Sequence, residues 1–201
     1  MASVIDICNL ALAHIGQGSI NSLDERSAQA EQCNLFYPYT RDSLLRQFPW
    51  NFATKSIMLA QVVSDIKEWS YVYSYPPECL HIRRIYNGTN SNQEIQNEYE
   101  VLTSGIDKYI GCDIENAYAK CTINIVDPML YDPLFIDVLA YKLALDLIMP
   151  LTNSATRTQE ITQKYQYALS IAMLHGAVEG AQKRSDNNKV RSDRAYINAR
   201  R

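Results

Sequence analysis

The most constraining stretch of the sequence runs from Leu44 to Ala53, where the pattern of apolar residues changes. Up to Pro49 the apolar side chains recur at helical spacing, and beyond it the residues are rich in the aromatic side chains that strands favour. Proline interrupts a helix because it lacks an amide hydrogen and its ring clashes with the preceding turn. The change predicts a structural joint formed by Phe48, Pro49, Trp50, Asn51 and Phe52. We expect the Trp50 and Phe52 rings to attach a β region to N-terminal helices, with Pro49 fixing the turn.

Two helices are expected before this joint, within residues 1–49. Apolar residues in Val4–Ile15 recur every three or four positions, which predicts an amphipathic helix that Gly16 ends. A second helix is expected over about Glu25–Gln47. Pro38 lies inside this second helix and is expected to kink or split it.

The central region, residues 50–127, is expected to be an inserted antiparallel sheet of four to five strands, because its links are too short for crossover helices. Trp69–Tyr75 has the strongest strand pattern, with aromatic and β-branched residues in near alternation. Asn87-Gly88 is a favourable hairpin turn, and Gly111–Asp113 is expected to turn as well. The further expected strands are Leu80–Tyr86, Glu94–Leu102 and Ala117–Val126.

A second helical pair is expected over residues 128–182. Asp132-Pro133 is a typical helix start, Pro150 stops that helix, and a last helix is expected over about Ala155–Gln182. The predicted fold class is therefore α+β and mainly helical. It is a four-helix bundle-like body with an antiparallel β insertion between the second and third helices, followed by an extended C-terminal arm, residues 183–201.

Charge is divided unevenly between this arm and the rest of the chain, whose net charge is −3. Lys183–Arg201 holds seven basic and two acidic residues, a net charge of +5, whereas the rest holds twelve basic and twenty acidic residues, a net charge of −8. One interpretation is a solvated end. The favoured one is an arm that is mobile alone and orders on a partner. Its partner-binding residues would be Lys189, Arg191, Arg194, Tyr196, Ile197, Arg200 and Arg201.

The residue types that carry chemistry form no recognisable site. The five cysteines have no metal-binding spacing, and the three histidines fall on different expected elements. Asp127, Asp132 and Asp137 suggest either paired catalytic carboxylates or, as we favour, two carboxylates that stabilise a helix N-terminus and one that faces solvent. We expect no catalytic, cofactor-binding or metal-binding residue. Charged residues interrupt the apolar run Met129–Leu151, which argues against a membrane span.

Three strings in the N-terminal half are similar to those of one protein family. They are I-C-N-L-A-L-A-H-I-G at Ile7–Gly16, I-N-S-L-D-E-R-S-A-Q-A at Ile20–Ala30, and R-D-S-L-L-R-Q-F-P-W-N-F-A within Tyr37–Ala53. The chain resembles the head-to-tail adaptor family of tailed bacteriophages, also called tail tubular protein A in short-tailed phages. The match is specific over about Ser3–Ala60 and rests on layout alone beyond it.

The resemblance implies a structural virion protein and not an enzyme. Such proteins form a twelve-fold ring at the head–tail junction, below the portal protein and above the tail nozzle or next tail ring. The ring extends the DNA channel and contacts passing DNA only transiently. The protein would be made in the host cytoplasm, without a cofactor or membrane partner. The alternative, taken from the residues, is a nucleic-acid-binding module that uses the basic arm and the tyrosine-rich sheet.

Overall fold

The structure, a computed structural model, describes residues 2–63, 68–88 and 98–198, with side chains described as far as Glu179. The elements within these residues place the chain in the α+β class, as predicted. The helices are α1 (Val4–His14), α2 (Ala28–Gln47), the 3-10 turn η1 (Pro128–Leu130), α3 (Pro133–Leu151) and α4 (Ala155–Asn198). The strands are β1 (Thr54–Met58), β2 (Tyr71–Ser74), β3 (Cys79–Asn87), β4 (Tyr99–Ser104), β5 (Asp107–Cys112) and β6 (Ala117–Ile123).

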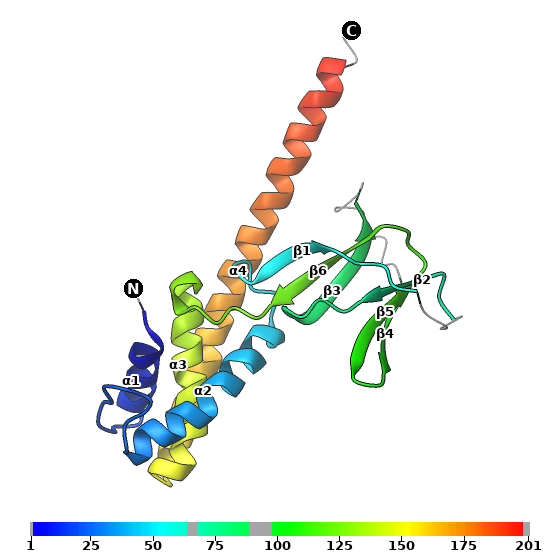
Figure 1. Cartoon of the computed structure of the whole chain (residues 1–201). Helices are drawn as coiled ribbons and strands as arrows, with labels where there is room; N and C mark the ends of the chain where they lie inside the picture. The colour runs from blue at the N-terminus through cyan, green and yellow to red at the C-terminus, as the bar shows by residue number, and fades with distance from the viewer. Residues whose placement is uncertain (1, 64–67, 89–97, 199–201) are drawn as a thin grey trace. The chain divides into compact units, whose positions relative to one another are not determined.

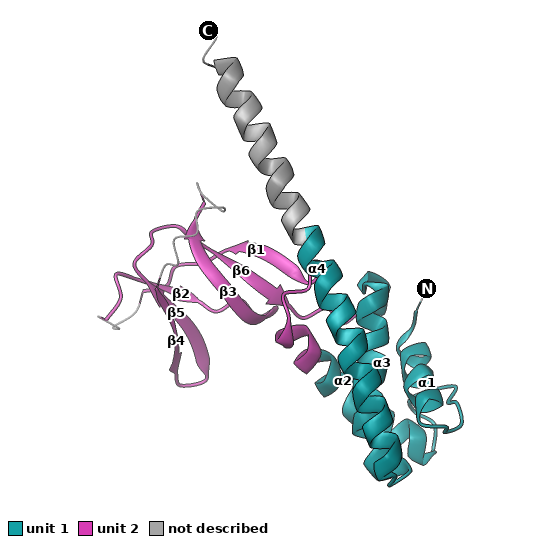
Figure 2. Cartoon of the chain, turned by 180° about the vertical axis from the view of Figure 1, so that it is seen from behind, with its two compact units in different colours: residues 1–41, 127–201 teal, residues 42–126 magenta. Residues whose placement is uncertain are grey.

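The chain divides into two compact units, coloured separately in Figure 2. The helical unit comprises Met1–Arg41 and Asp127–Arg201, and the β unit comprises Asp42–Val126. The last residues of α2 therefore belong to the β unit.

The core of the helical unit is centred on α3, which packs against α1 and α4. The Asp132 side chain begins α3 by accepting a hydrogen bond from the Leu134 amide at 2.8 Å. This supports the helix-start interpretation of that carboxylate. Helix α1 ends as predicted before Gly16, whose φ of +71° suits a residue without a Cβ. The buried residues of α3 are Phe135, Val138, Leu139, Ala140, Leu143, Ala144, Leu147 and Ile148.

Helix α2 differs from the prediction in its start and in its continuity. It begins at Ala28, because Ser27 provides the cap: the Ser27 hydroxyl accepts a hydrogen bond from the Ala30 amide at 3.3 Å. The expected split at Pro38 is wrong, since the helix continues through it. Pro38 and the residue four positions earlier, Asn34, are both exposed. Water can therefore bond the carbonyl that the proline leaves without an amide partner.

Helix α4 is longer than predicted, as Figure 1 shows. Its backbone stays helical past residue 182 and ends at Asn198, which corrects the expectation of an unstructured arm that begins at Lys183. The sequence has neither glycine nor proline between Ala181 and Asn198. Extending an existing helix avoids the cost of nucleation, so a polar sequence without helix breakers can continue it.

The β unit contains two small antiparallel sheets on one core, not the single sheet that was predicted. The strand orders are β1-β6-β3 and β2-β5-β4. Residues from both sheets share the core, including Tyr73 of β2, Ile82 of β3, Ile110 of β5 and Cys121 of β6.

Two predicted turns of the β unit are wrong. Asn87-Gly88 does not close a hairpin, because β3 pairs with β6 and Asn87 lies opposite Ala117. The Gly111–Asp113 turn is replaced in part by strand β5, and Gly111 packs so closely on the Trp69 indole ring that there is no room for a Cβ. Only part of the expected strand 94–102 can be compared, because residues 94–97 lie outside the described residues.

Candidate functional site

The predicted joint is centred on Trp50, which is 4% exposed. The indole Nε1 donates a hydrogen bond of 2.9 Å to the carbonyl of Leu44, one of the last four carbonyls of α2, which have no partner within the helix. The Phe48 and Phe52 rings lie 5.2 and 6.2 Å from the Trp50 ring, centroid to centroid. The Thr54 hydroxyl, at the start of β1, donates to the Trp50 carbonyl at 2.7 Å. Trp50 thus links α2 to β1; its attachment of the β region to the N-terminal helices stays a prediction.

Arg83 of β3 also caps the end of α2. Its guanidinium donates to the Arg46 carbonyl at 3.0 Å and to the Thr122 hydroxyl at 2.9 Å. Arg46, in the last turn of α2, donates to the Leu80 carbonyl of β3 at 3.1 Å. Positive charge is favourable at a helix C-terminus, so the two arginines join α2 to β3 by contacts in both directions.

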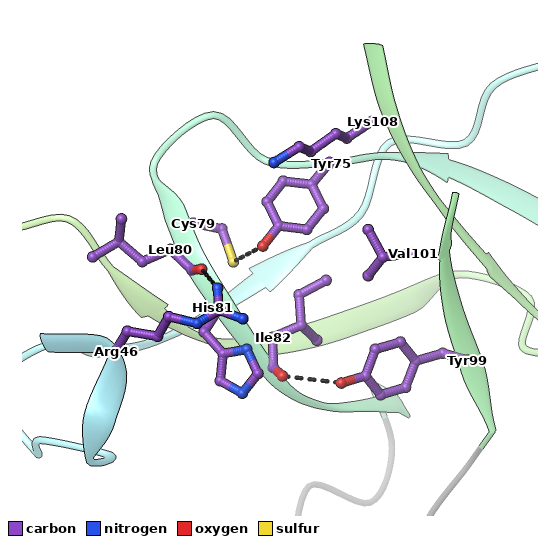
Figure 3. Close-up of a pocket in the computed structure, with 9 residues that line it drawn as sticks. All are labelled: Arg46, Tyr75, Cys79, Leu80, His81, Ile82, Tyr99, Val101 and Lys108. Carbon is purple, nitrogen blue, oxygen red and sulfur yellow. Dashed lines mark hydrogen bonds between the residues drawn. The ribbon is translucent and has the colours of Figure 1, made fainter. Parts of the chain in front are cut away.

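A pocket of about 410 Å³ lies beside this contact, wholly within the β unit (Figure 3). Three of its lining residues carry nitrogen groups that can bear charge: Arg46, His81 and Lys108. Two tyrosines contribute aromatic rings to the wall, and the Tyr99 hydroxyl donates to the Ile82 carbonyl at 3.0 Å. The other lining residues are Tyr75, Cys79, Leu80, Ile82 and Val101.

The electrostatic environment of this pocket is positive. Burial, followed by the charges of Arg83 and Arg46, lowers the pKa of His81. Burial, followed by the charge of Arg46, likewise lowers the pKa of Arg83. The Lys108 ammonium lies 5.9 Å from the centre of the Tyr75 ring, within range of a cation–π interaction. Among the described residues, Arg46, His81 and Lys108 form no ion pair.

A thiol also borders the pocket. Cys79 is 7% exposed, and its Sγ donates to the Tyr75 hydroxyl oxygen at 3.5 Å. The thiol of Cys121 stabilises the Cys79 thiolate, as does Tyr75, which lowers the pKa of Cys79 to about 7. The same thiol contact and burial raise the pKa of Cys121. Within the described residues no set of three or more histidine, cysteine, aspartate or glutamate side chains could hold a metal ion.

The structure leaves the predicted partner-binding residues of the arm largely untested. Lys189, Arg191, Arg194, Tyr196 and Ile197 lie on the α4 backbone, beyond the last described side chain. Arg200 and Arg201 lie outside the described residues. Their role in binding a partner therefore stays a prediction.

The sequence analysis missed the pocket because its residues come from α2, β3, β4, β5 and the segment before β3. Its only signal in the sequence was the short run of basic and aromatic residues around His81 and Arg83. That run has no motif spacing, so only the pairing of the strands brings it close to Lys108 and Tyr99.

No family model matches the chain, and a search of curated proteins found no match either. A search of the described helices for a segment long and apolar enough to cross a membrane found none.

Proposed function

We propose that this chain is a head-to-tail adaptor of a tailed bacteriophage, a structural protein that joins the portal to the tail. The observation that carries the proposal is the resemblance of Ile7–Gly16, Ile20–Ala30 and Tyr37–Ala53 to that family. In the fold the first string covers most of α1 and its C-terminus, and the second covers the loop before α2 and the start of α2. The third covers the second half of α2 and the Trp50 joint.

The finer architecture belongs to the same proposal. The four helices would form a bundle-like body, into which the β unit is inserted between α2 and α3. Twelve copies would form a ring at the head–tail junction that extends the DNA channel, with the portal on one side and the tail nozzle or next tail ring on the other. Ring closure requires heterologous interfaces, in which one surface of a copy meets a different surface of its neighbour.

Charge distribution supports the assignment of the arm. The −8 charge of residues 1–182 and the +5 charge of residues 183–201 favour contacts between the arm of one copy and an acidic surface of another protein. The basic residues of the arm would bind the portal or a neighbouring copy.

The test is incorporation into particles. Particles purified from cells that make the full chain are expected to contain it, and cryo-microscopy should place it as a ring at the junction. A chain that ends at Gln182 should fold with an unchanged melting temperature and be missing from particles. Replacement of exposed Arg26 by Gln is the matched control, because it removes one positive charge outside the arm.

The two parts of the proposal fail differently. If the full chain is absent from purified particles, the adaptor assignment is wrong. If the shortened chain completes particles as the full chain does, the adaptor assignment stands and the docking role of the arm is wrong. Tight DNA binding that weakens steeply with salt, by a chain absent from particles, would favour the nucleic-acid-binding alternative.

A further inference from the structure

The pocket of the β unit has a combination of groups that the adaptor proposal does not use. We propose that it binds a short segment of a partner protein in which a carboxylate side chain stands next to an apolar side chain. Its volume of about 410 Å³ is that of a small-ligand site and suits two or three side chains of a peptide. The proposal goes beyond the adaptor function and does not depend on it.

The carboxylate half of the ligand follows from the charges. Arg46, His81 and Lys108 line one pocket, and within the described residues none of them has an acidic partner. The positive charges of Arg46 and Lys108 attract a carboxylate, and His81 can add a hydrogen bond. Arginine and lysine in the lining of a partly desolvated pocket can give a carboxylate charge-assisted hydrogen bonds.

The apolar half follows from the wall. Ile82 is 2% exposed and lies at the wall with Val101, which is 46% exposed on β4 (Figure 3). The rings of Tyr75 and Tyr99 complete the apolar surface, and each hydroxyl is already hydrogen-bonded within the protein. The pocket therefore offers the ligand both aromatic and aliphatic surface and the positive charges of Arg46 and Lys108.

Acidic neighbours argue against a polyanion as the ligand. Glu98 and Glu100 flank Tyr99 in sequence, and Asp107 precedes Lys108; all three are exposed. A nucleic acid that extends beyond the pocket would meet these carboxylates and be repelled, whereas one carboxylate inside the pocket would not. The basic arm of this chain is excluded as the occupant because it carries the same sign of charge as the pocket.

The experiment uses the full chain and a displayed library of random seven-residue peptides. Selected peptides are expected to be enriched in aspartate or glutamate next to leucine, isoleucine or phenylalanine. Replacement of Lys108 by Gln should weaken binding of a selected peptide about tenfold, the effect of losing one charged hydrogen bond. Replacement of Val101 by Ser should also weaken binding, whereas the Arg26→Gln control should not change it.

Each outcome decides the proposal. Lys108 and Val101 are both exposed, so the variants should keep the melting temperature of the parent chain, which is measured first. Peptides without acidic enrichment, or equal binding to the Lys108→Gln variant, would overturn the proposal. So would a twenty-nucleotide oligothymidylate that binds more tightly than the selected peptides and loses affinity in the Lys108→Gln variant, because the pocket would then be a nucleic-acid site.

Discussion

The two units of this chain are stabilised in different ways. The helical unit buries the aliphatic and aromatic side chains of α3 between α1 and α4, where helix backbones satisfy their own hydrogen bonds. The core of the β unit includes tyrosines and cysteines, and some of their polar atoms form hydrogen bonds with backbone groups. The Tyr73 hydroxyl, for example, donates to the Ile114 carbonyl at 2.6 Å. The stability of the helical unit therefore depends mainly on the packing of its buried side chains. The stability of the β unit depends on packing and also on specific hydrogen bonds.

The two units also differ in the reactive groups that they expose. The helical unit buries the polar residues Thr40 and Arg41, and the Thr40 hydroxyl donates a hydrogen bond of 2.5 Å to the Asp146 carboxylate. The β unit, in contrast, presents cations and a thiol at a pocket. Both tryptophans, Trp50 and Trp69, lie in the β unit, so their fluorescence reports on that unit, while helical circular dichroism reports mainly on the other.

The largest expected effect is that of Phe135→Ala in α3. Phe135 is 0% exposed, and removing a buried phenylalanine ring costs about 3–5 kcal/mol of unfolding free energy. Urea unfolding followed by helical circular dichroism should show this loss, whereas the tryptophan fluorescence transition should move little. Leu174→Ala, at a position 64% exposed on α4, is the control. Equal shifts in both signals would mean that the two units unfold together, which would contradict the idea that each unit has its own source of stability.

The second prediction compares the thiol pairs of the two units. The Cys79 pKa of about 7 leaves roughly half of this thiol ionised at neutral pH, about fiftyfold more than the ordinary pKa of 9.0 gives. Alkylation of Cys79 by iodoacetamide should therefore rise through pH 7 and level off above pH 8. Cys33 also has a lowered pKa through its contact with Cys8, yet it is 0% exposed and should stay unmodified in the folded chain.

Peptide mapping after alkylation identifies the modified residue. Cys79→Ser should abolish the early reaction and leave the rest unchanged. A reaction that levels off only above pH 9, or one that modifies Cys33 first, would show that pocket exposure does not distinguish the two pairs.

The third prediction removes a polar contact without changing volume. Tyr73→Phe removes the hydroxyl that donates to the half-buried Ile114 carbonyl and accepts from the buried Ala117 amide, which costs about 1–3 kcal/mol. The tryptophan transition in urea should shift, while helical circular dichroism should hardly change. Tyr39→Phe is the control, because Tyr39 is 73% exposed on α2. A shift no larger than that of the control would mean that the β unit, like the helical unit, is stabilised by packing and not by this hydrogen bond.

The sequence predicted the helical unit better than the β unit, for a physical reason. Helices are set by local spacing and by caps, so Gly16 and Asp132 marked real helix ends. The wrong predictions also have local causes. Pro38 indicated a break in the helix, and nothing in the sequence showed that the hydrogen bond it removes lies on the exposed side. The polar composition after residue 182 concealed the continuation of α4.

Strand pairing, by contrast, depends on contacts between distant residues. Asn87-Gly88 has the composition of a hairpin turn, yet β3 pairs with β6, about thirty residues later in the sequence. Strand β5 contains a charged pair and a glycine, which weaken the strand pattern, and Gly111 is explained only by the Trp69 ring that packs on it. The pocket could not be predicted for the same reason, because its residues come together only when the strands pair.

The smallest expected effect is the pH dependence of the two half-buried histidines, one in each unit. Burial and the charge of Lys164 lower the pKa of His14, against an opposing effect of Asp137. Burial and two arginines lower the pKa of His81. A histidine with a lowered pKa binds its proton less tightly when folded than when unfolded. Stability is therefore lost as the pH falls through the unfolded value of about 6.5, and the loss is complete below the folded pKa.

Urea midpoints measured at pH 7.5 and pH 5.5, above the range where most carboxylates titrate, isolate this contribution. His14→Gln should flatten the pH dependence of the helical transition and leave the tryptophan transition unchanged, and His81→Gln should do the reverse. Each variant is thus the control for the other. If either variant flattens both transitions, proton binding in one unit is coupled to folding of the other, and the two units do not unfold independently.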